Sequence, residues 1–184
     1  MAIDKKTFLH NVTICHDTRE QKNSHIVEQL ESFGVSHREK KLDFGDYTFE
    51  CGGRDFSLSC VIERKANVDE LYSNLVCDRE RIEKEFAAAG NIANDFILLL
   101  EGCGDETELK NFEIPPWEML LRGRKVRNIG EHCYATLKSW QCGNRYKFRT
   151  LYVKDRKETA AKILEEFYYY WRNYKIFTAS RRNK

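Results

Sequence analysis

Residues 61–69 of this 184-residue chain read Val61-Ile62-Glu63-Arg64-Lys65-Ala66-Asn67-Val68-Asp69. The apolar residues that lead into Glu63 are typical of a strand, and Asn67 followed three residues later by Glu70 is typical of a helix start. Because side chains alternate along a strand, Glu63 and Lys65 should share one face and Arg64 should point to the other. The charged triplet then sits between a strand and a helix, where α/β proteins tend to form sites.

The charges around this triplet suit one kind of chemistry. Gly45-Asp46, further upstream, supplies a second carboxylate. Carboxylates hold hard divalent cations, and a lysine beside them can orient an attacking water or stabilise the charge that develops in phosphodiester hydrolysis. The combination predicts a nuclease. Glu-x-Lys is also common on solvent-facing strand ends, so the pattern taken alone allows an ordinary surface strand.

Length and composition indicate one globular domain spanning residues 1–184. The chain is 41% hydrophobic and 12% aromatic, and its only two prolines are adjacent, which leaves little room for a linker. No apolar stretch approaches membrane-spanning length, and the N-terminus lacks the apolar core of a signal peptide. We therefore expect an intracellular, cytoplasmic protein that does not enter a membrane.

The seven cysteines agree with a reducing compartment. Their number is odd and none forms a Cys-x-x-Cys pair, as a disulfide framework or a zinc ribbon would normally show. Cys133 and Cys142, with the neighbouring His132, match the usual spacings of zinc ligands poorly.

Charge is divided unevenly along the chain. Residues 119–157 hold eleven Lys or Arg and two acidic residues, whereas residues 1–118 hold fourteen basic and twenty-four acidic residues. This asymmetry predicts that the acidic residues 1–118 supply the metal-binding carboxylates and that a basic segment at about 119–157 faces the DNA. Solvated faces that happen to cluster are the alternative. The candidate phosphate contacts in this segment are Arg122, Arg124, Lys125 and Arg127.

Hydrophobic periodicity and turn residues predict alternating elements. Strands are expected at 11–15, around 37–50, at 56–65, at 96–100 and near 148–153, with a hairpin turn at 51–54. Helices are expected from Ser24 to Gly34, from about 68 to 89, after the Pro115-Pro116 loop, near 131–141 and at about 157–177. The order is βαββαβ followed by αβα, which places a mixed central sheet between flanking helices. Three charged clusters then converge on strand ends: Asp17 with Glu20, Asp46, and Glu63 with Lys65.

Several segments together resemble the XPF-type structure-specific nucleases, whose nuclease domain has the restriction-endonuclease-like fold. Gly45-Asp46 followed by Glu63-Arg64-Lys65-x-x-x-Asp69 resembles the motif of that family. Four further segments match in order, and the resemblance spans nearly the whole chain: Asp17-x-Arg19-Glu20, Arg79-Glu80-Arg81, Leu98-Leu99-Leu100-Glu101-Gly102 and Glu158-Thr159-Ala160-Ala161.

The resemblance implies roles for individual residues. Asp46 and Glu63 would be the principal ligands of Mg²⁺ or Mn²⁺, with Asp17 as a further ligand and Glu20 in the same acidic pocket. Lys65 would be the catalytic lysine, and Arg64 would support the site or contact phosphate. Three positions have an equally good structural interpretation. Asp69 could simply place a favourable negative charge in the first turn of a helix. Arg79 and Arg81 could either bind DNA or pair with Glu83 and Glu85.

The chain also departs from larger family members, because it contains neither a helicase domain nor a helix-hairpin-helix module. It looks like the short stand-alone members of bacteria and phages, and a preference for branched DNA in repair or recombination does not transfer automatically. A non-catalytic DNA-binding subunit that pairs with an active nuclease is the alternative function, although the intact Gly-Asp and Glu-Arg-Lys motifs argue against degeneration.

Aromatic residues crowd the expected last helix, at Phe167-Tyr168-Tyr169-Tyr170-Trp171, Tyr174 and Phe177. They cover more than half of the helix circumference, whereas a single core-facing stripe would need only some of them. Because nuclease domains of this family dimerise through their C-terminal helices, a homodimer through this helix is expected. Base stacking is a lesser possibility, and a helix buried on two sides is as good an explanation.

Overall fold

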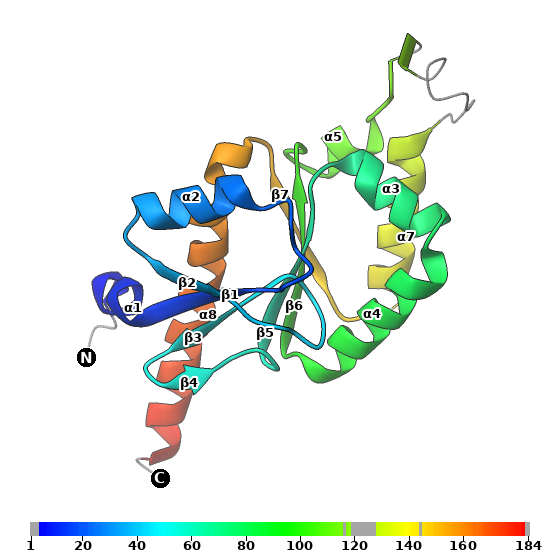
Figure 1. Cartoon of the computed structure of the whole chain (residues 1–184). Coiled ribbons are helices and arrows are strands. Elements are labelled where there is room, and N and C mark those ends of the chain that lie inside the picture. Colours follow the sequence, from blue (N-terminus) through cyan, green and yellow to red (C-terminus); the bar gives the residue numbers. More distant parts are fainter. Residues whose placement is uncertain (1–3, 116, 119–127, 144, 183–184) are drawn as a thin grey trace.

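The computed structural model describes residues 4–115, 117–118, 128–143 and 145–182 of the chain. A seven-stranded sheet runs through the middle, with helices on both faces (Figure 1). The strands are β1 Val12–His16, β2 Ser36–Glu39, β3 Tyr47–Cys51, β4 Arg54–Asp55, β5 Cys60–Lys65, β6 Asp95–Glu101 and β7 Arg149–Val153. The helices are α1 Lys5–Asn11, α2 Ser24–Ser32, α3 Val68–Val76, α4 Arg79–Ile92, α5 Glu106–Lys110, α7 Ile129–Cys142, the 3₁₀ turn η1 Arg156–Glu158 and α8 Thr159–Arg182.

The strands lie in the order β2-β1-β3-β5-β6-β7, and β4 pairs with β3. β1 pairs in parallel with β2 and antiparallel with β3, and β3 pairs antiparallel with β5. β5, β6 and β7 are parallel to one another. β3 therefore runs against the five other strands of this order, so its first residue lies at the same edge of the sheet as the carboxyl ends of β1, β5 and β6. The predicted mixed sheet between helices is confirmed.

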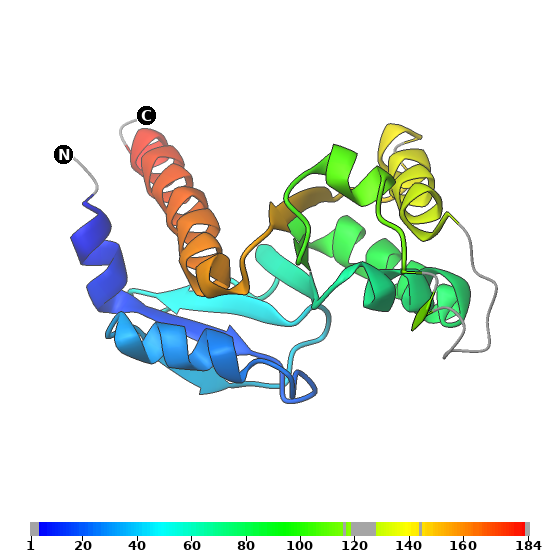
Figure 2. The same cartoon turned by 90° about the horizontal axis from the view of Figure 1, so that it is seen from above.

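Each face of the sheet carries its own hydrophobic core. Ile62, Ile97 and Leu99 belong to a core that α1, α2 and α8 cover, whereas Val61, Leu98 and Leu100 belong to a core that α3, α4, α5 and α7 cover. The view from above separates the two groups of helices (Figure 2). Because both faces are covered, β5 and β6 are apolar almost throughout, as the continuous apolar run at 96–100 predicts.

The last helix closes the first of these cores. Phe8 of α1 packs against Tyr168 and Trp171 of α8, with ring centroids 5.6 and 5.4 Å apart. Figures 1 and 2 accordingly place α1 and the C-terminal part of α8 on the same side of the molecule. No helix in the described ranges is both long and apolar enough to cross a membrane.

Two predicted elements are divided in the structure. The strand expected around 37–50 is two strands, β2 and β3, because the chain crosses the edge of the sheet between them and turns at Gly45, whose φ is +72°. The helix expected at 68–89 is α3 and α4. Its break falls at Asp78, where φ is −115° and ψ is 28°, outside the helical range.

Other boundaries also differ. The turn at 51–54 forms a hairpin between β3 and the two-residue strand β4, while β5 begins only at Cys60. α1 and α5 were not predicted from the sequence. The expected helix start at Asn67 is confirmed, since the Asn67 side chain accepts a hydrogen bond from the Glu70 backbone N–H at 2.8 Å.

Candidate active site

Three chain segments meet at the carboxyl end of β5. The backbone N–H of Asp46 donates to the carbonyl of Ile62, and the N–H of Asp17 donates to the carbonyl of Asp46, both at 2.8 Å. Gly45 makes the first approach possible, because a Cβ at that position would lie 2.2 Å from the Val61 side chain. The predicted convergence of segments is therefore present in the structure.

Glu63 and Lys65 lie on one face of β5, as strand alternation predicts. Both are buried, and the Lys65 ammonium lies 2.5 Å from Oε1 of Glu63. The other carboxylate oxygen of Glu63, Oε2, is buried without a hydrogen-bond partner among the described residues. An acceptor left in this state is costly unless a proton or a cation reaches it.

Asp46 brings a second carboxylate to this place. Its Oδ2 accepts a hydrogen bond from the backbone N–H of Arg64 at 2.7 Å. Burial, and then the negative charge of Glu63, raise the pKa of Asp46 well above its usual value, although Lys65 opposes the shift. Two carboxylates thus compete for one ammonium.

Lys65 keeps its charge in this site. Burial alone would lower the pKa of Lys65, but the carboxylates of Glu63 and Asp46 outweigh it and raise the pKa above the ordinary lysine value. An ammonium held in this way donates hydrogen bonds and does not accept a proton near neutral pH.

Glu85, on α4, is a site residue that sequence reasoning missed. Its carboxyl group lies within hydrogen-bonding reach of the Glu63 carboxylate, and it also pairs with Arg81 at 3.5 Å. Burial and repulsion from Glu63 raise the pKa of Glu85 to about 7. When protonated, Glu85 is a second donor to the Glu63 carboxylate beside Lys65.

The opposite face of β5 carries a separate network centred on Glu101, also missed from the sequence. Glu101 is fully buried, and its Oε2 accepts hydrogen bonds from Arg64 at 2.6 Å and Arg156 at 3.1 Å. Its Oε1 is bonded by His25 at 2.8 Å and Thr159 at 2.6 Å. Burial would raise the pKa of Glu101, but these bonds, led by that from Arg64, hold it below the usual value.

The Arg64 side chain therefore points away from the Glu63 face, whereas Glu20 lies close enough to Asp46 for its charge to raise the pKa of Asp46 further. The Arg64 guanidinium is buried and also reaches Glu20 at 3.5 Å. Asp17 is engaged elsewhere: one oxygen accepts bonds from the backbone and side chain of Arg19, and the other accepts from the Leu42 backbone N–H at 2.6 Å. In this arrangement Asp17 shapes the loop after β1, and its predicted role as a metal ligand stays a prediction.

The remaining predicted residues fall at the rim or outside the described ranges. Asp69 is half-buried in the first turn of α3. Arg79 and Arg81 are exposed on α4. Arg79 pairs with Glu83 at 2.9 Å and Arg81 with Glu85 at 3.5 Å, which are the ion pairs that the sequence offered as the alternative to DNA binding. Four candidate phosphate contacts lie outside the described residues: Arg122, Arg124, Lys125 and Arg127.

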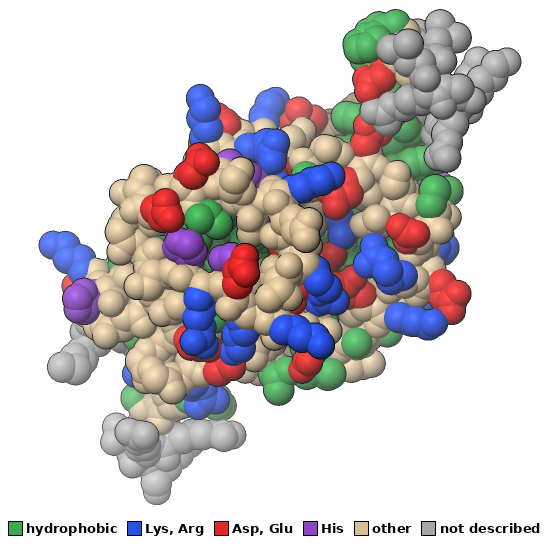
Figure 3. All heavy atoms as spheres, viewed as in Figure 1, with side chains coloured by type: hydrophobic (Ala, Val, Ile, Leu, Met, Phe, Trp, Pro, Cys, Tyr) green, Lys and Arg blue, Asp and Glu red, His purple; other side chains and the backbone are tan. Residues whose placement is uncertain are grey.

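Ion pairs offset much of the charge on the described part of the basic segment. Lys138 pairs with Glu106, Arg145 with Glu83, Arg149 with Asp95 and Glu166, Lys154 with Glu108, and Arg156 with Glu101. Figure 3 shows basic and acidic side chains interspersed over the face that it presents. The asymmetry along the sequence is thus partly balanced in space.

The donors at the end of β5 suit a hard divalent cation. The described ranges contain no group of three or more His, Cys, Asp or Glu side chains arranged to hold a metal ion. Mg²⁺, however, is often bound through one or two carboxylates, with water and substrate phosphate oxygens as the other ligands. Asp46 and Glu63 supply two carboxylates, and Oε2 of Glu63 is an oxygen that accepts no hydrogen bond from the described residues as they stand. The residues present therefore fit such an ion.

Known proteins share this fold. The chain is similar to XPF from Aeropyrum pernix, with a TM-score of 0.58 and 22% identity over 84% of this chain and 59% of that chain. It is also similar to XPF from Aeropyrum pernix in complex with DNA, with a TM-score of 0.57 and 23% identity over 84% of this chain and 62% of that chain. It thus spans about three fifths of the length of these proteins. No curated protein matches it.

A family model covers most of the chain. The model of the ERCC4 domain matches residues 16–165, a range that holds Asp46, Glu63 and Lys65. The sheet, the grouping of these residues at its edge and this match agree with the resemblance seen in the sequence. The chain belongs to the ERCC4 domain family of XPF-type nucleases.

Proposed function

We propose that this protein is a divalent-metal-dependent endonuclease that hydrolyses phosphodiester bonds of DNA. The observation that carries the proposal is the grouping of Asp46, Glu63 and Lys65 at the carboxyl end of β5, in a chain of the ERCC4 domain family. An XPF structure of the same fold is a complex with DNA, which supports DNA as the substrate.

Asp46 and Glu63 would hold the Mg²⁺ or Mn²⁺ ion. When bound, such an ion polarises a phosphoryl oxygen and lowers the pKa of a coordinated water. The Lys65 ammonium stays protonated, because neighbouring carboxylates raise its pKa. Lys65 therefore stabilises negative charge on the phosphate or orients the attacking water, and it is not the base that takes the proton.

Contacts with the DNA backbone would come from basic side chains around this edge of the sheet. Arg79 and Arg81 are exposed on α4, the helix that also brings Glu85 to Glu63. Their ion pairs with Glu83 and Glu85 lie on the surface, where such pairs are weak and a phosphate can replace the carboxylate. A role in repair or recombination, with branched DNA as the substrate, is part of this proposal by resemblance to the family alone, and the cleavage panel below tests it.

A cleavage panel tests the proposal. Flap, fork, Holliday-junction, single-stranded and duplex DNA would be incubated with wild type, Glu63→Gln and Lys65→Met, each with Mn²⁺ and with EDTA. Wild type should cut at least one substrate only with Mn²⁺. Each variant should be slower by about a hundredfold or more, the usual effect of removing one charged group from the reacting centre.

The matched control is Glu80→Gln, which removes an exposed carboxylate on α4 whose only ion pair is to Lys84 within the described residues. It should cleave as wild type does. Cleavage at the wild-type rate by both Glu63→Gln and Lys65→Met would refute the assignment of the active site.

A second candidate is a non-catalytic DNA-binding subunit that partners an active nuclease. It is favoured by one observation: the described residues contain no group of three metal-ligating side chains. Mn²⁺ titration separates the two candidates. A metal that binds the folded state stabilises it by about 2.7 kcal/mol at a hundred times its Kd, whereas a subunit without a metal site shows no Mn²⁺-dependent rise in melting temperature.

The proposal includes a homodimer formed through α8. This helix exposes large apolar side chains, among them Tyr169 and Ile176 with 49% and 51% of their surface accessible, which supports such a contact.

The proposal also includes a reducing compartment such as the cytoplasm. All seven cysteines are free thiols, which supports it.

A further inference from the structure

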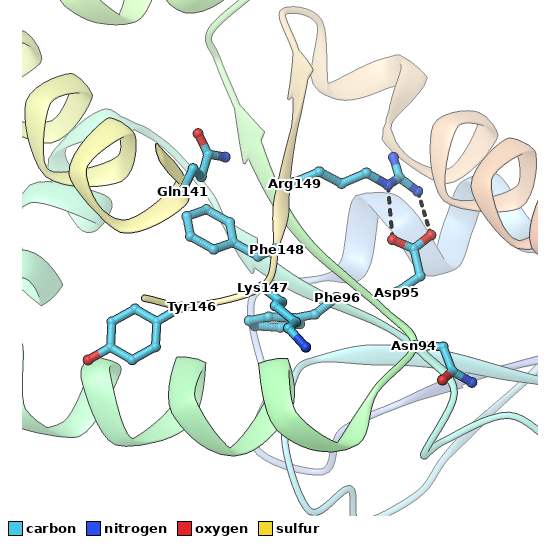
Figure 4. Close-up of a pocket in the computed structure, with 8 residues that line it drawn as sticks. All are labelled: Asn94, Asp95, Phe96, Gln141, Tyr146, Lys147, Phe148 and Arg149. Atoms are coloured by element: carbon cyan, nitrogen blue, oxygen red, sulfur yellow. Dashed lines mark hydrogen bonds and ion pairs between the residues drawn. The ribbon is translucent and has the colours of Figure 1, made fainter. Parts of the chain in front are cut away.

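Figure 4 shows a pocket of about 320 Å³. It lies at the end of the sheet opposite the candidate active site, since Asp95 and Arg149 begin β6 and β7 whereas Lys65 ends the parallel strand β5. Its lining comes from the amino ends of β6 and β7, from the segment before β7 and from α7. The lining residues are Asn94, Asp95, Phe96, Gln141, Tyr146, Lys147, Phe148 and Arg149. Asp95 and Glu101 begin and end β6, so a strand of seven residues, about 20 Å, separates this pocket from the other end of the sheet.

Aromatic rings form one part of the lining. Phe148 and Tyr146 are only half-buried, and both rings meet the ring of Phe86 on α4 edge-on, with centroids 4.8 and 6.4 Å apart. Phe86 is itself fully buried and holds the two rings against the core. Fixed, partly exposed aromatic rings are surfaces on which a planar base can stack.

Two amide groups supply hydrogen-bonding atoms to the lining, Gln141 beside Phe148 and Asn94 at the other end, beyond Asp95 (Figure 4). The Gln141 side-chain N–H donates to Thr150 at 3.2 Å, and the Asn94 side-chain N–H donates to Tyr170 at 3.3 Å. Each amide thus directs its nitrogen to the protein, and its oxygen has no hydrogen bond to a described residue. Such oxygens can accept hydrogen bonds from the amino group of a base.

Of the two cations in the lining, Arg149 forms ion pairs with described residues and Lys147 does not. Arg149 makes a bidentate pair with Asp95, drawn as dashed lines in Figure 4, and also contacts Glu166 at 2.6 Å. Lys147 is exposed and makes no ion pair or side-chain hydrogen bond within the described residues. A lysine ammonium is a compact point charge of the kind that binds phosphate.

The position of Lys147 is fixed by its backbone. Gly90 lies inside α4, and a Cβ on Gly90 would come within 3.0 Å of the Lys147 nitrogen and 3.2 Å of its carbonyl oxygen. A glycine inside a helix costs about 1 kcal/mol relative to alanine. At this position it lets the segment that carries Tyr146, Lys147 and Phe148 pack directly against α4.

We propose that this pocket binds a nucleotide, with the base against the Phe148 and Tyr146 rings and the phosphate on Lys147. The aromatic rings match the face of the base, the amide oxygens match its amino group, and the Lys147 ammonium matches the phosphate. The nucleotide is either a free mononucleotide or an unpaired residue of single-stranded DNA. The site lies apart from Glu63, and the proposal does not rest on the proposed nuclease activity.

Isothermal titration in EDTA tests the proposal with dAMP, inorganic phosphate and a four-residue oligodeoxyadenylate as ligands. Wild type should bind dAMP saturably and more tightly than phosphate. Lys147→Gln should weaken dAMP binding by about tenfold or more, the effect of losing one hydrogen bond from a charged group. Phe148→Leu should weaken it by about tenfold through lost stacking. Tighter binding of the oligonucleotide than of dAMP identifies single-stranded DNA as the source, and weaker binding identifies the free nucleotide.

Two further variants serve as controls. Lys157→Gln removes an exposed lysine near the other end of β7 and should bind dAMP as wild type does. Glu63→Gln should also bind normally while losing cleavage, which separates this proposal from the proposed function. Absence of saturable dAMP binding by wild type, equal affinity for dAMP and phosphate, or unchanged affinity in a folded Lys147→Gln variant would overturn the proposal.

Discussion

Glu85 couples the candidate active site to pH. Its pKa of about 7 in the folded protein lies above the ordinary glutamate value, because burial and the charge of Glu63 disfavour its ionised form. The folded state then holds a proton that the unfolded chain releases near pH 4.5. The free energy of unfolding should fall as pH rises from about 4.5 through 7, by about 1 to 3 kcal/mol from this group.

Urea unfolding at pH 5, 6, 7 and 8 in EDTA measures this effect. Glu85→Gln keeps the shape of the side chain without the ionisation, so its stability should fall less than that of wild type over the same range. Parallel pH profiles for the two proteins would show that Glu85 does not carry the shifted titration.

The sequence predicted only part of the site. Asp46, Glu63 and Lys65 were found because strand alternation and a two-residue motif define them locally. Glu101 was missed because it follows an apolar strand like any terminal charge, and its four donors come from distant positions on α2, β5, η1 and α8. Glu85 was missed because its spacing from Arg81 is that of an ordinary surface pair on a helix.

At the scale of elements, the contact between α5 and α7 depends on one glycine. A Cβ on Gly130, in the first turn of α7, would lie 2.1 Å from the Leu109 carbonyl oxygen and 2.7 Å from the Phe112 nitrogen. Both atoms belong to the backbone and cannot rotate away. Gly130→Ala should therefore lower the free energy of unfolding by about 1 to 3 kcal/mol or more, although alanine is the better helix former.

Thermal unfolding followed by circular dichroism checks this expectation. The control is Ser139→Ala, at an exposed position of the same helix, which should leave stability unchanged within about 0.5 kcal/mol. A Gly130→Ala variant as stable as wild type would mean that α5 and α7 are not packed as closely as described.

The elements that the sequence predicted well are those with strong periodicity. Leu71, Leu75, Ile82 and Phe86 are all fully buried, as the pattern over 68–89 indicates. The break between α3 and α4 was missed because apolar spacing continues across it, and no glycine or proline marks it. The division between β2 and β3 was missed because its cause is tertiary: Asp46 must leave the first strand to pair with Ile62.

At the scale of the whole molecule, α8 has two kinds of surface. Phe167 and Trp171 are buried against the sheet and α1, whereas Ile176 and Phe177 lie on the exposed part of the helix. If that part joins two copies, Ile176→Lys should place a charge in the contact and give a monomeric mass. Wild type should have a dimeric mass at micromolar concentration.

Sedimentation equilibrium measures both masses. Ile92→Lys is the matched control, because Ile92 ends α4 and is as exposed as Ile176, at 51%. It should sediment as wild type does. A monomeric wild-type protein, or a dimer that survives Ile176→Lys, would exclude this contact.

The four donors around Glu101 also bear on how the protein is made. Thr159 and Arg156 follow Glu101 by 58 and 55 residues, while His25 precedes it by 76. A ribosome therefore releases Glu101 long before it releases two of the donors that neutralise this buried carboxylate. The network that holds the Arg64 side chain reaches its final form only after η1 and the first turn of α8 have left the exit tunnel, which places its completion late in synthesis.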